Sequence, residues 1–176
     1  RERLWNVVTE REREFLLSKE PSERIGIWAS WQAEPLWVLC WALERVPELG
    51  DVTEQCDPVP ALAAMPRVGR STSSFRKRAR TRPACDVLDQ LSIVWQIRSK
   101  VHQEWARACG MARGVGELKI VLKDPTKEEP PPPGGVDAGV ALEWHKALNW
   151  LVGYMGEGWA DITADTTWDS DVDDDG

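Results

Sequence analysis

The apolar segment near the end of the chain carries residues suited to acid–base chemistry. His145 and Asn149 are four positions apart, so on a helix both would lie on one side. Glu34 is a lone carboxylate in a second apolar run, ASWQAEPLWVLCWAL. If Glu34 faced His145, the two could transfer protons near neutral pH, where the charge of an imidazole is easily changed. Asp161 and Asp165, just beyond the segment, could add carboxylates to such a site.

The same side chains also have a structural explanation, which the sequence favours. Buried polar groups are generally hydrogen-bonded whatever their role, so His145 and Asn149 could satisfy backbone or indole groups of a core. Glu34 would then pair with Arg98 or Lys146. The chain contains two histidines and no HExxH pattern, P-loop or GxSxG elbow. We therefore assign no catalytic residue and predict neither a cofactor nor a metal.

Charge is distributed unevenly along the chain, whose net charge of −7 disfavours nucleic acid as a partner. Residues 67–82, the basic segment, carry seven bases and no acid, and Arg76, Lys77 and Arg78 lie within it. Residues 157–176, the acidic tail, carry eight acids and no base. Such runs are usually solvated surfaces, and these two could contact each other. The alternative is that the basic segment docks an anionic partner.

Tryptophan dominates the aromatic residues, with 11 Trp against two Phe and one Tyr. Most of these indoles must be buried, because a domain of this size cannot display them all without aggregating. We therefore predict a tryptophan-rich core. Trp159 and Trp168, which follow the last predicted helix, could be exposed anchors for a partner or clamps that hold the C-terminal segment.

Length and cysteine content restrict the class of protein. A chain of 176 residues fits one domain with its own core. Its four cysteines form no CxxC pair, which predicts reduced thiols in a cytoplasmic protein rather than a metal site. No apolar run approaches the roughly 20 residues that cross a bilayer, so we expect no membrane span. The chain begins with Arg, and we expect it to be excised or processed from a longer protein.

Hydrophobic periodicity and capping signals predict three main helices. The first covers residues 22–46 and should break around residues 30–34, because Pro35 removes a helical hydrogen bond. The second covers residues 84–109, and the third covers residues 138–154. Together they predict a mainly α, single helical domain with bundle-like or orthogonal packing.

Shorter elements complete this domain, which we place at residues 1–156, before the acidic tail. Thr9 and Glu12 form a capping box for a short helix, and further short helices are expected at residues 60–65 and 71–80. An insert at residues 110–137, rich in proline and glycine, could contain one short strand at residues 114–123. Asp137 is the expected N-cap of the last helix.

Three motifs resemble one family. SWQAEPLWVLCWAL, RTRPACDVLDQL and PPPPGGVDAGVALEWHKALNWLVG followed by WADITADT are similar to the mostly bacterial domain of unknown function numbered 4272. The resemblance extends from about Leu4 to Thr166. It implies a mostly helical, cytosolic domain, and it carries over neither an activity nor a site. The chain departs from the family pattern at Pro35 and in a longer stretch before its proline run.

These observations predict a non-enzymatic interaction or accessory domain of the cytoplasm. Its partner would be another protein, bound through the basic segment, the insert or the acidic tail, with Arg76, Lys77, Arg78, Trp159 and Asp165 as candidate contacts. One alternative is an enzyme or small-ligand binder with Glu34, His145 and Asn149 in a tryptophan-lined pocket. A second is an immunity-type inhibitor whose acidic tail covers a basic nuclease surface. The sequence does not determine the oligomeric state.

Overall fold

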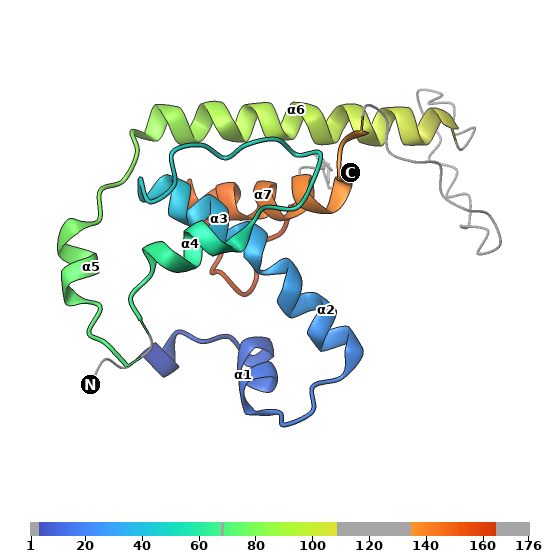
Figure 1. Ribbon diagram of the computed structural model, residues 1–176. Coiled ribbons are helices and arrows are strands. Elements are labelled where there is room, and N and C mark those ends of the chain that lie inside the picture. Colours follow the sequence, from blue (N-terminus) through green and yellow to red (C-terminus); the bar gives the residue numbers. More distant parts are fainter. Residues whose placement is uncertain (1–3, 68, 109–134, 165–176) are drawn as a thin grey trace, which may run out of the picture.

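The computed structural model describes residues 4–67, 69–108 and 135–164, and all regular secondary structure in these ranges is helical (Figure 1). In chain order the elements are η1 (Leu4–Asn6), α1 (Glu10–Leu17), α2 (Glu23–Trp31), α3 (Ala33–Ala42), α4 (Pro58–Ala64), α5 (Ser73–Arg78), α6 (Ala84–Ala108), α7 (Ala138–Leu151) and η3 (Tyr154–Gly156). The predicted fold class, a mainly α single domain, is confirmed. None of the described helices is both long and apolar enough to cross a membrane. The strand predicted at 114–123 lies outside the described residues, as do most of the insert and of the acidic tail.

The predicted helix 22–46 is divided at Gln32 into α2 and α3. Pro35 lies in the first turn of α3, where its missing N–H leaves the carbonyl of Trp31 without the usual helical donor. A proline is tolerated at that position because the N–H groups in the first turn of a helix have no carbonyl acceptor within that helix. A missing N–H there removes no hydrogen bond of α3 itself. The break expected around residues 30–34 is therefore confirmed.

The C-terminus of α3 comes earlier than predicted, at Ala42. Glu44 adopts a left-handed backbone conformation with φ 54°. The N–H of Arg45 donates to the carbonyl of Cys40 at 2.7 Å, and the N–H of Glu44 donates to the carbonyl of Trp41 at 3.0 Å. These two bonds form the motif with which a left-handed residue closes a helix. The chain can therefore turn away from the helix axis directly after α3.

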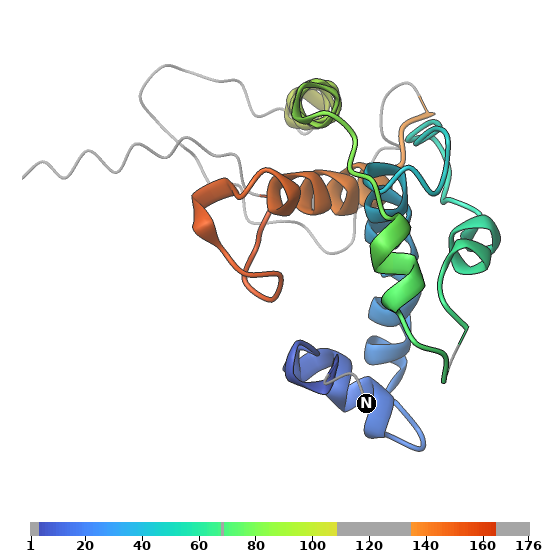
Figure 2. The same ribbon diagram turned by 90° about the vertical axis from the view of Figure 1, so that its left-hand side faces the viewer.

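The two long helices predicted in the second half of the chain are α6 and α7. α7 begins as expected, because Oδ1 of Asp137 accepts hydrogen bonds from the N–H groups of Gly139 at 2.8 Å and Val140 at 3.1 Å. It ends before Gly153, whose φ of 69° is left-handed. Figure 2 shows α6 nearly end-on while α7 lies across the picture, so the axes of the two helices are not parallel. The two helices pack against each other where they cross.

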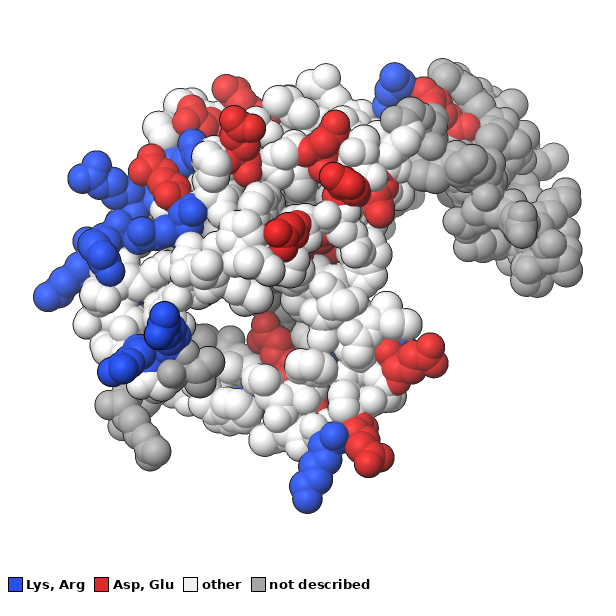
Figure 3. All heavy atoms as spheres, viewed as in Figure 1, with Lys and Arg blue, Asp and Glu red and all other residues white. Residues whose placement is uncertain are grey.

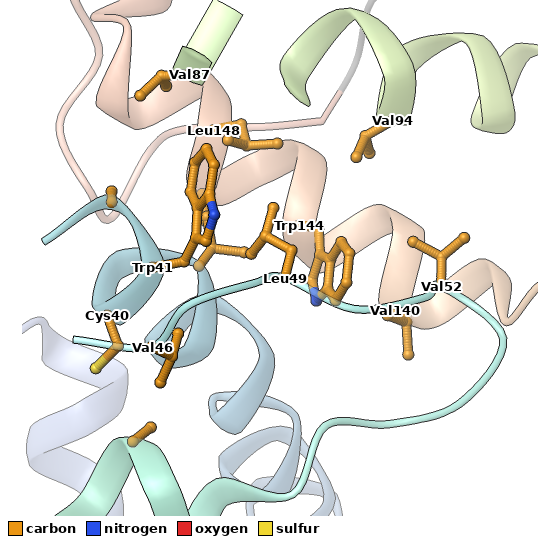
Figure 4. Close-up of a cluster of buried hydrophobic side chains, with 14 residues drawn as sticks. Cys40, Trp41, Val46, Leu49, Val52, Val87, Val94, Val140, Trp144 and Leu148 are labelled. Carbon is orange, nitrogen blue, oxygen red and sulfur yellow. The ribbon is translucent and has the colours of Figure 1, made fainter. Parts of the chain in front are cut away.

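The hydrophobic core lies where α3, α6 and α7 meet (Figure 4). Val38, Val94 and Val140 are almost completely buried there, together with Trp41 and Trp144. Of the other described indoles, Trp31, Trp37 and Trp159 pack against this centre half-buried, Trp28 is half-buried elsewhere, and Trp5, Trp95 and Trp150 are exposed. Among the described side chains, the core therefore uses tryptophan at two buried positions and valine and leucine around them.

α7 also packs very closely against α2. A Cβ atom added at Gly139 would lie 2.5 Å from the Cη2 atom of Trp31, a distance that real Cβ contacts do not reach. Glycine in the first turn of α7 therefore allows the Trp31 ring to pack against the helix backbone.

The connection between α3 and α4 returns along the core and is pinned by hydrogen bonds. Nε1 of Trp37 donates to the carbonyl of Leu49 at 2.8 Å, and the N–H of Asp137 donates to the carbonyl of Val52 at 2.7 Å. Leu49 and Val52 are themselves buried. This connection is therefore part of the core, and it brings the backbone of residues 43–57 next to the start of α3.

Candidate functional site

Glu34, in the first turn of α3, is only 1% exposed. Its Oε1 accepts the backbone N–H of Cys56 at 2.8 Å, and its Oε2 accepts the indole Nε1–H of Trp144 at 2.8 Å. This carboxyl group therefore joins α3, the connection before α4, and α7. The pairing with Arg98 or Lys146 expected from the sequence was wrong. The partners are N–H groups that the fold delivers from distant parts of the chain.

His145 and Asn149 share one side of α7, as their spacing predicts, and each is 1% exposed. Nδ1 of His145 accepts a hydrogen bond from Nη1 of Arg98, with the two nitrogens 2.5 Å apart. The same Nη1 donates to the carbonyl of Ala164, and Nδ2 of Asn149 donates to the carbonyl of Thr163 at 3.1 Å. The three side chains together fasten the last described residues onto α6 and α7.

These contacts place the four candidate acid–base residues in different surroundings. Glu34 bonds to N–H groups of the core, whereas His145 bonds to Arg98 on α6. Asp161 is exposed, and Asp165 lies outside the described residues. Both Glu34 and His145 are buried with protein partners, which favours the structural explanation of these side chains.

The surroundings of His145 keep its imidazole neutral. Burial first, and the Arg98 guanidinium second, lower the pKa of His145 from 6.5 to about 4. Because its Nδ1 accepts from Arg98, the ring proton lies on Nε2, which has no hydrogen-bond partner among the described residues. A buried neutral histidine of this kind links stability to pH.

We expect His145 to make the domain less stable as the pH falls from about 6.5 to 4. In this window the unfolded chain takes up a proton that the folded chain does not, so the free energy of unfolding decreases, by at most about 3 kcal/mol. Urea unfolding of the wild type and of His145→Gln, repeated across the window, measures this contribution. The wild type should lose more stability on acidification than the variant, and equal losses would contradict the assignment.

The measurement compares two proteins because Glu143 has the opposite effect. Burial chiefly raises the pKa of Glu143; Lys146 and Arg11 oppose this rise and Glu34 adds to it. A raised carboxyl pKa means that the folded state binds its proton more readily, so acidification stabilises the fold through this group. The contribution of Glu143 is present in both proteins and cancels in their difference.

Cys56 is a neighbour of Glu34 that sequence reasoning missed. Burial first, and the Glu34 carboxyl group second, raise the pKa of the Cys56 thiol to about 12. The thiol therefore remains protonated and is a poor nucleophile. No local signal could have found this contact, because the two residues are 22 positions apart.

The basic segment contains bases of two kinds. Arg82 is half-buried and binds the end of α3: its Nε donates to the carbonyl of Trp41 at 2.8 Å, and its Nη2 donates to the carbonyls of Val46 at 3.3 Å and Pro47 at 2.7 Å. Its guanidinium also lies over the Trp41 ring, 4.8 Å from the centroid. This arginine is a structural residue. By contrast, Arg67, Arg70, Arg76, Lys77, Arg78 and Arg80 are exposed.

α5 is held in place by an aromatic contact. The guanidinium of Arg45, just after α3, lies 4.9 Å from the centroid of the Phe75 ring, and its Nη2 donates to the Phe75 carbonyl at 3.4 Å. Arg76, Lys77 and Arg78 follow directly in the helix and face solvent. Figure 3 shows Lys and Arg gathered over α5 and the chain around it. The ion pair found in the described parts of the chain is elsewhere, between Lys100 and Glu104.

Trp159 contacts the domain rather than standing free of it. Its ring packs edge-on against Trp150, with centroids 5.4 Å apart, and Nζ of Lys146 lies 5.8 Å from its centroid. Ile162, three residues later, is buried. Of the two explanations given by the sequence, the structure favours the clamp for Trp159. Trp168 lies outside the described residues.

A family model described as "Domain of unknown function (DUF4272)" matches residues 1–162. The chain belongs to this family. The match includes α1 to α7 and the buried partners of Glu34 and His145, so the resemblance of the three sequence motifs is confirmed. No curated protein and no solved structure matches the chain.

The described His, Cys, Asp and Glu side chains do not form the arrangement that a metal ion requires. Within the described ranges, no three side chains of His, Cys, Asp or Glu lie together as metal ligands would. The described cysteines, Cys40, Cys56 and Cys85, are free thiols.

Proposed function

We propose that this DUF4272 domain is a non-enzymatic interaction domain of the cytoplasm that binds another protein through its basic segment. One observation carries the proposal: the segment holds six exposed bases, three of them on α5, which Arg45 contacts through Phe75, and no carboxylate lies within 4.0 Å of them among the described residues. Exposed charge of one sign, left unneutralised, attracts a partner of the opposite sign and accelerates association.

The bases fall into two groups, those that contact the fold and those that face solvent, and this difference supports the proposed function. Arg45 and Arg82 bind carbonyl groups and aromatic rings of the fold, so they would be needed in any protein with this architecture. Arg76 and Lys77 make no such contact to the core, and their charge adds nothing evident to stability. Bases that make no contact with the core are more simply explained by binding to a partner molecule.

The negative net charge of the whole chain supports a protein rather than a nucleic acid as the partner. A net charge of −7 repels a polyanion at long range, whereas a local acidic surface on a protein needs only a local basic one. Free thiols at Cys40, Cys56 and Cys85 support a reducing compartment.

Charge reversal tests the proposal. The intact chain is immobilised and exposed to a soluble extract of the cells that express it, and captured proteins are quantified by mass spectrometry. We expect Arg76→Glu, Lys77→Glu and Arg78→Glu, combined in one variant, to reduce capture of the specific partner at least tenfold. Raising the salt concentration should weaken capture by the wild type.

The matched control reverses three exposed bases elsewhere. Lys19→Glu, Arg24→Glu and Lys100→Glu change the net charge by the same amount but leave the basic segment intact. Capture by this control should equal that of the wild type. The proposal is wrong if both triple variants capture equally, or if the wild type captures no protein that a charge-matched inert protein does not.

A further inference from the structure

α4 presents an apolar face that the described part of the fold leaves exposed. Oδ1 of Asp57 accepts from the N–H of Val59 at 2.9 Å and so caps the helix, while Ala61 is completely buried in the core. The opposite side exposes large apolar groups: Val59 is 64% exposed, Leu62 58% and Met65 37%. Val59 and Leu62 stand on α4 and Met65 caps its C-terminus, and together they form a patch of the kind that marks an interaction site.

This apolar face adjoins the basic segment. The chain leaves α4 at Ala64 and enters α5 at Ser73, so Arg67 and Arg70 lie in the connection between the two helices. Figures 1 and 3 share one view, in which α4, α5 and this connection surround a hollow of the surface with basic side chains at its rim. Met65 at the end of α4 is two positions before Arg67, so the apolar face of α4 leads directly into the basic segment.

From this juxtaposition we propose that the apolar face of α4 and the basic segment together dock an acidic amphipathic helix of a partner protein. The proposal rests on the proposed function and deepens it by naming the chemistry of the partner. The occupant would place apolar side chains, spaced three and four residues apart, on Val59, Leu62 and Met65. Its flanking carboxylates would face the bases of the basic segment.

The apolar face of α4 and the positive charge of the basic segment together favour an acidic amphipathic helix over other ligands. α4 itself carries no charged residue, so a ligand that binds by charge alone leaves its apolar face in water. A nucleic acid backbone has charge but no apolar stripe to bury on α4. An uncharged apolar helix would cover α4 but would leave the six exposed bases unmatched. An acidic amphipathic helix satisfies both surfaces at once.

The experiment measures binding of labelled synthetic helices to the intact chain by fluorescence anisotropy. The test peptide has roughly 18 residues, with leucine along one face and glutamate elsewhere, so that it forms about five helical turns. One control peptide has the same composition with the leucines scattered around the helix, and another has lysine in place of glutamate. We expect the test peptide to bind at least tenfold more tightly than either control.

Two single substitutions locate the binding surface. Leu62→Asp should weaken binding of the test peptide about tenfold, because it places an acid on the apolar face of α4. Leu16→Asp is the matched control, since Leu16 lies on α1 and is 60% exposed, and it should bind as the wild type does. Both positions are exposed, so both variants should keep the wild-type far-ultraviolet circular dichroism.

The outcomes separate this inference from the proposed function. If Leu62→Asp binds the peptide normally while reversal of Arg76, Lys77 and Arg78 abolishes binding, the basic segment acts without α4 and the inference is overturned. Tighter binding of a DNA duplex than of the peptide would also overturn it. So would self-association of the wild type that Leu62→Asp removes, because a second copy of the chain would then be the occupant. If reversal of the three bases leaves capture of cellular partners intact, the proposed function itself fails.

Discussion

Replacing Glu34 with alanine is expected to lower the free energy of unfolding by about 4 kcal/mol. The substitution removes both acceptors of the Glu34 carboxyl group and leaves the N–H of Cys56 and the Nε1–H of Trp144 without partners. Each unsatisfied buried donor costs about 1–3 kcal/mol, and the shortened side chain leaves a cavity in addition. A loss of this size is a large part of the roughly 5–15 kcal/mol that stabilises an ordinary domain.

Urea unfolding followed by far-ultraviolet circular dichroism measures this effect. Glu23→Ala is the matched control, because Glu23 occupies the first turn of α2 and is exposed, and it should change stability by less than about 0.5 kcal/mol. A change of less than about 1 kcal/mol for Glu34→Ala would contradict the structural role.

A double-mutant cycle separates the indole bond from the rest. Trp144→Phe removes the donor to Oε2 but keeps an aromatic ring in the core. If the bond contributes as the geometry indicates, the two substitutions together should cost about 1–2 kcal/mol less than the sum of their separate effects. Strict additivity would mean that the Glu34 carboxyl group and the indole do not stabilise each other.

Replacing Arg82 with alanine is expected to cost about 3 kcal/mol. Its guanidinium provides hydrogen bonds to the carbonyls of Trp41, Val46 and Pro47, and it covers the Trp41 ring. The carbonyl of Trp41 belongs to the last turn of α3 and also accepts the N–H of Glu44, so Arg82 adds a second donor where α3 ends. Without the arginine, the end of α3 and the start of the connection to α4 lose the group that holds them together.

Arg80→Ala is the control for Arg82, because Arg80 lies two positions earlier in the same segment and is exposed. Its unfolding midpoint in urea should stay at the wild-type value. Arg82→Lys should recover little of the loss, since an ammonium group cannot reach several carbonyls in the fixed geometry of a guanidinium. Full rescue by lysine, or equal effects at positions 80 and 82, would show that only charge matters here.

The helices were predictable because their signals are local. Thr9 and Glu12 form the expected capping box, with Thr9 N–H donating to Glu12 at 2.7 Å. Asp137 caps α7, and Pro35 divides the long apolar run. Each of these effects acts within one or two helical turns, so the order of residues is sufficient to predict it. The end of α3 was placed too late because a left-handed glutamate, Glu44, gives a weaker signal than glycine.

The partners of the buried polar groups were not predictable in the same way. Complementary charge suggested Arg98 or Lys146 for Glu34, whereas the fold supplies a backbone N–H and an indole 110 positions away. Arg98 instead bonds to His145 on α7. Which of several chemically acceptable partners is chosen depends on where the helices cross.

The sequence alone determined the helical class, the starts of the long helices, the break before Pro35 and the two charged segments. All of these follow from composition or from spacing within a few turns of helix, whereas the family followed from the resemblance of three longer motifs. Only the tertiary structure decided that Glu34, His145 and Asn149 are buried with protein partners, that Arg82 belongs to the fold, and that the bases around α5 remain exposed. The physical reason is that burial and hydrogen-bond partnership depend on contacts between residues far apart in the chain, and spacing along the chain carries no information about these.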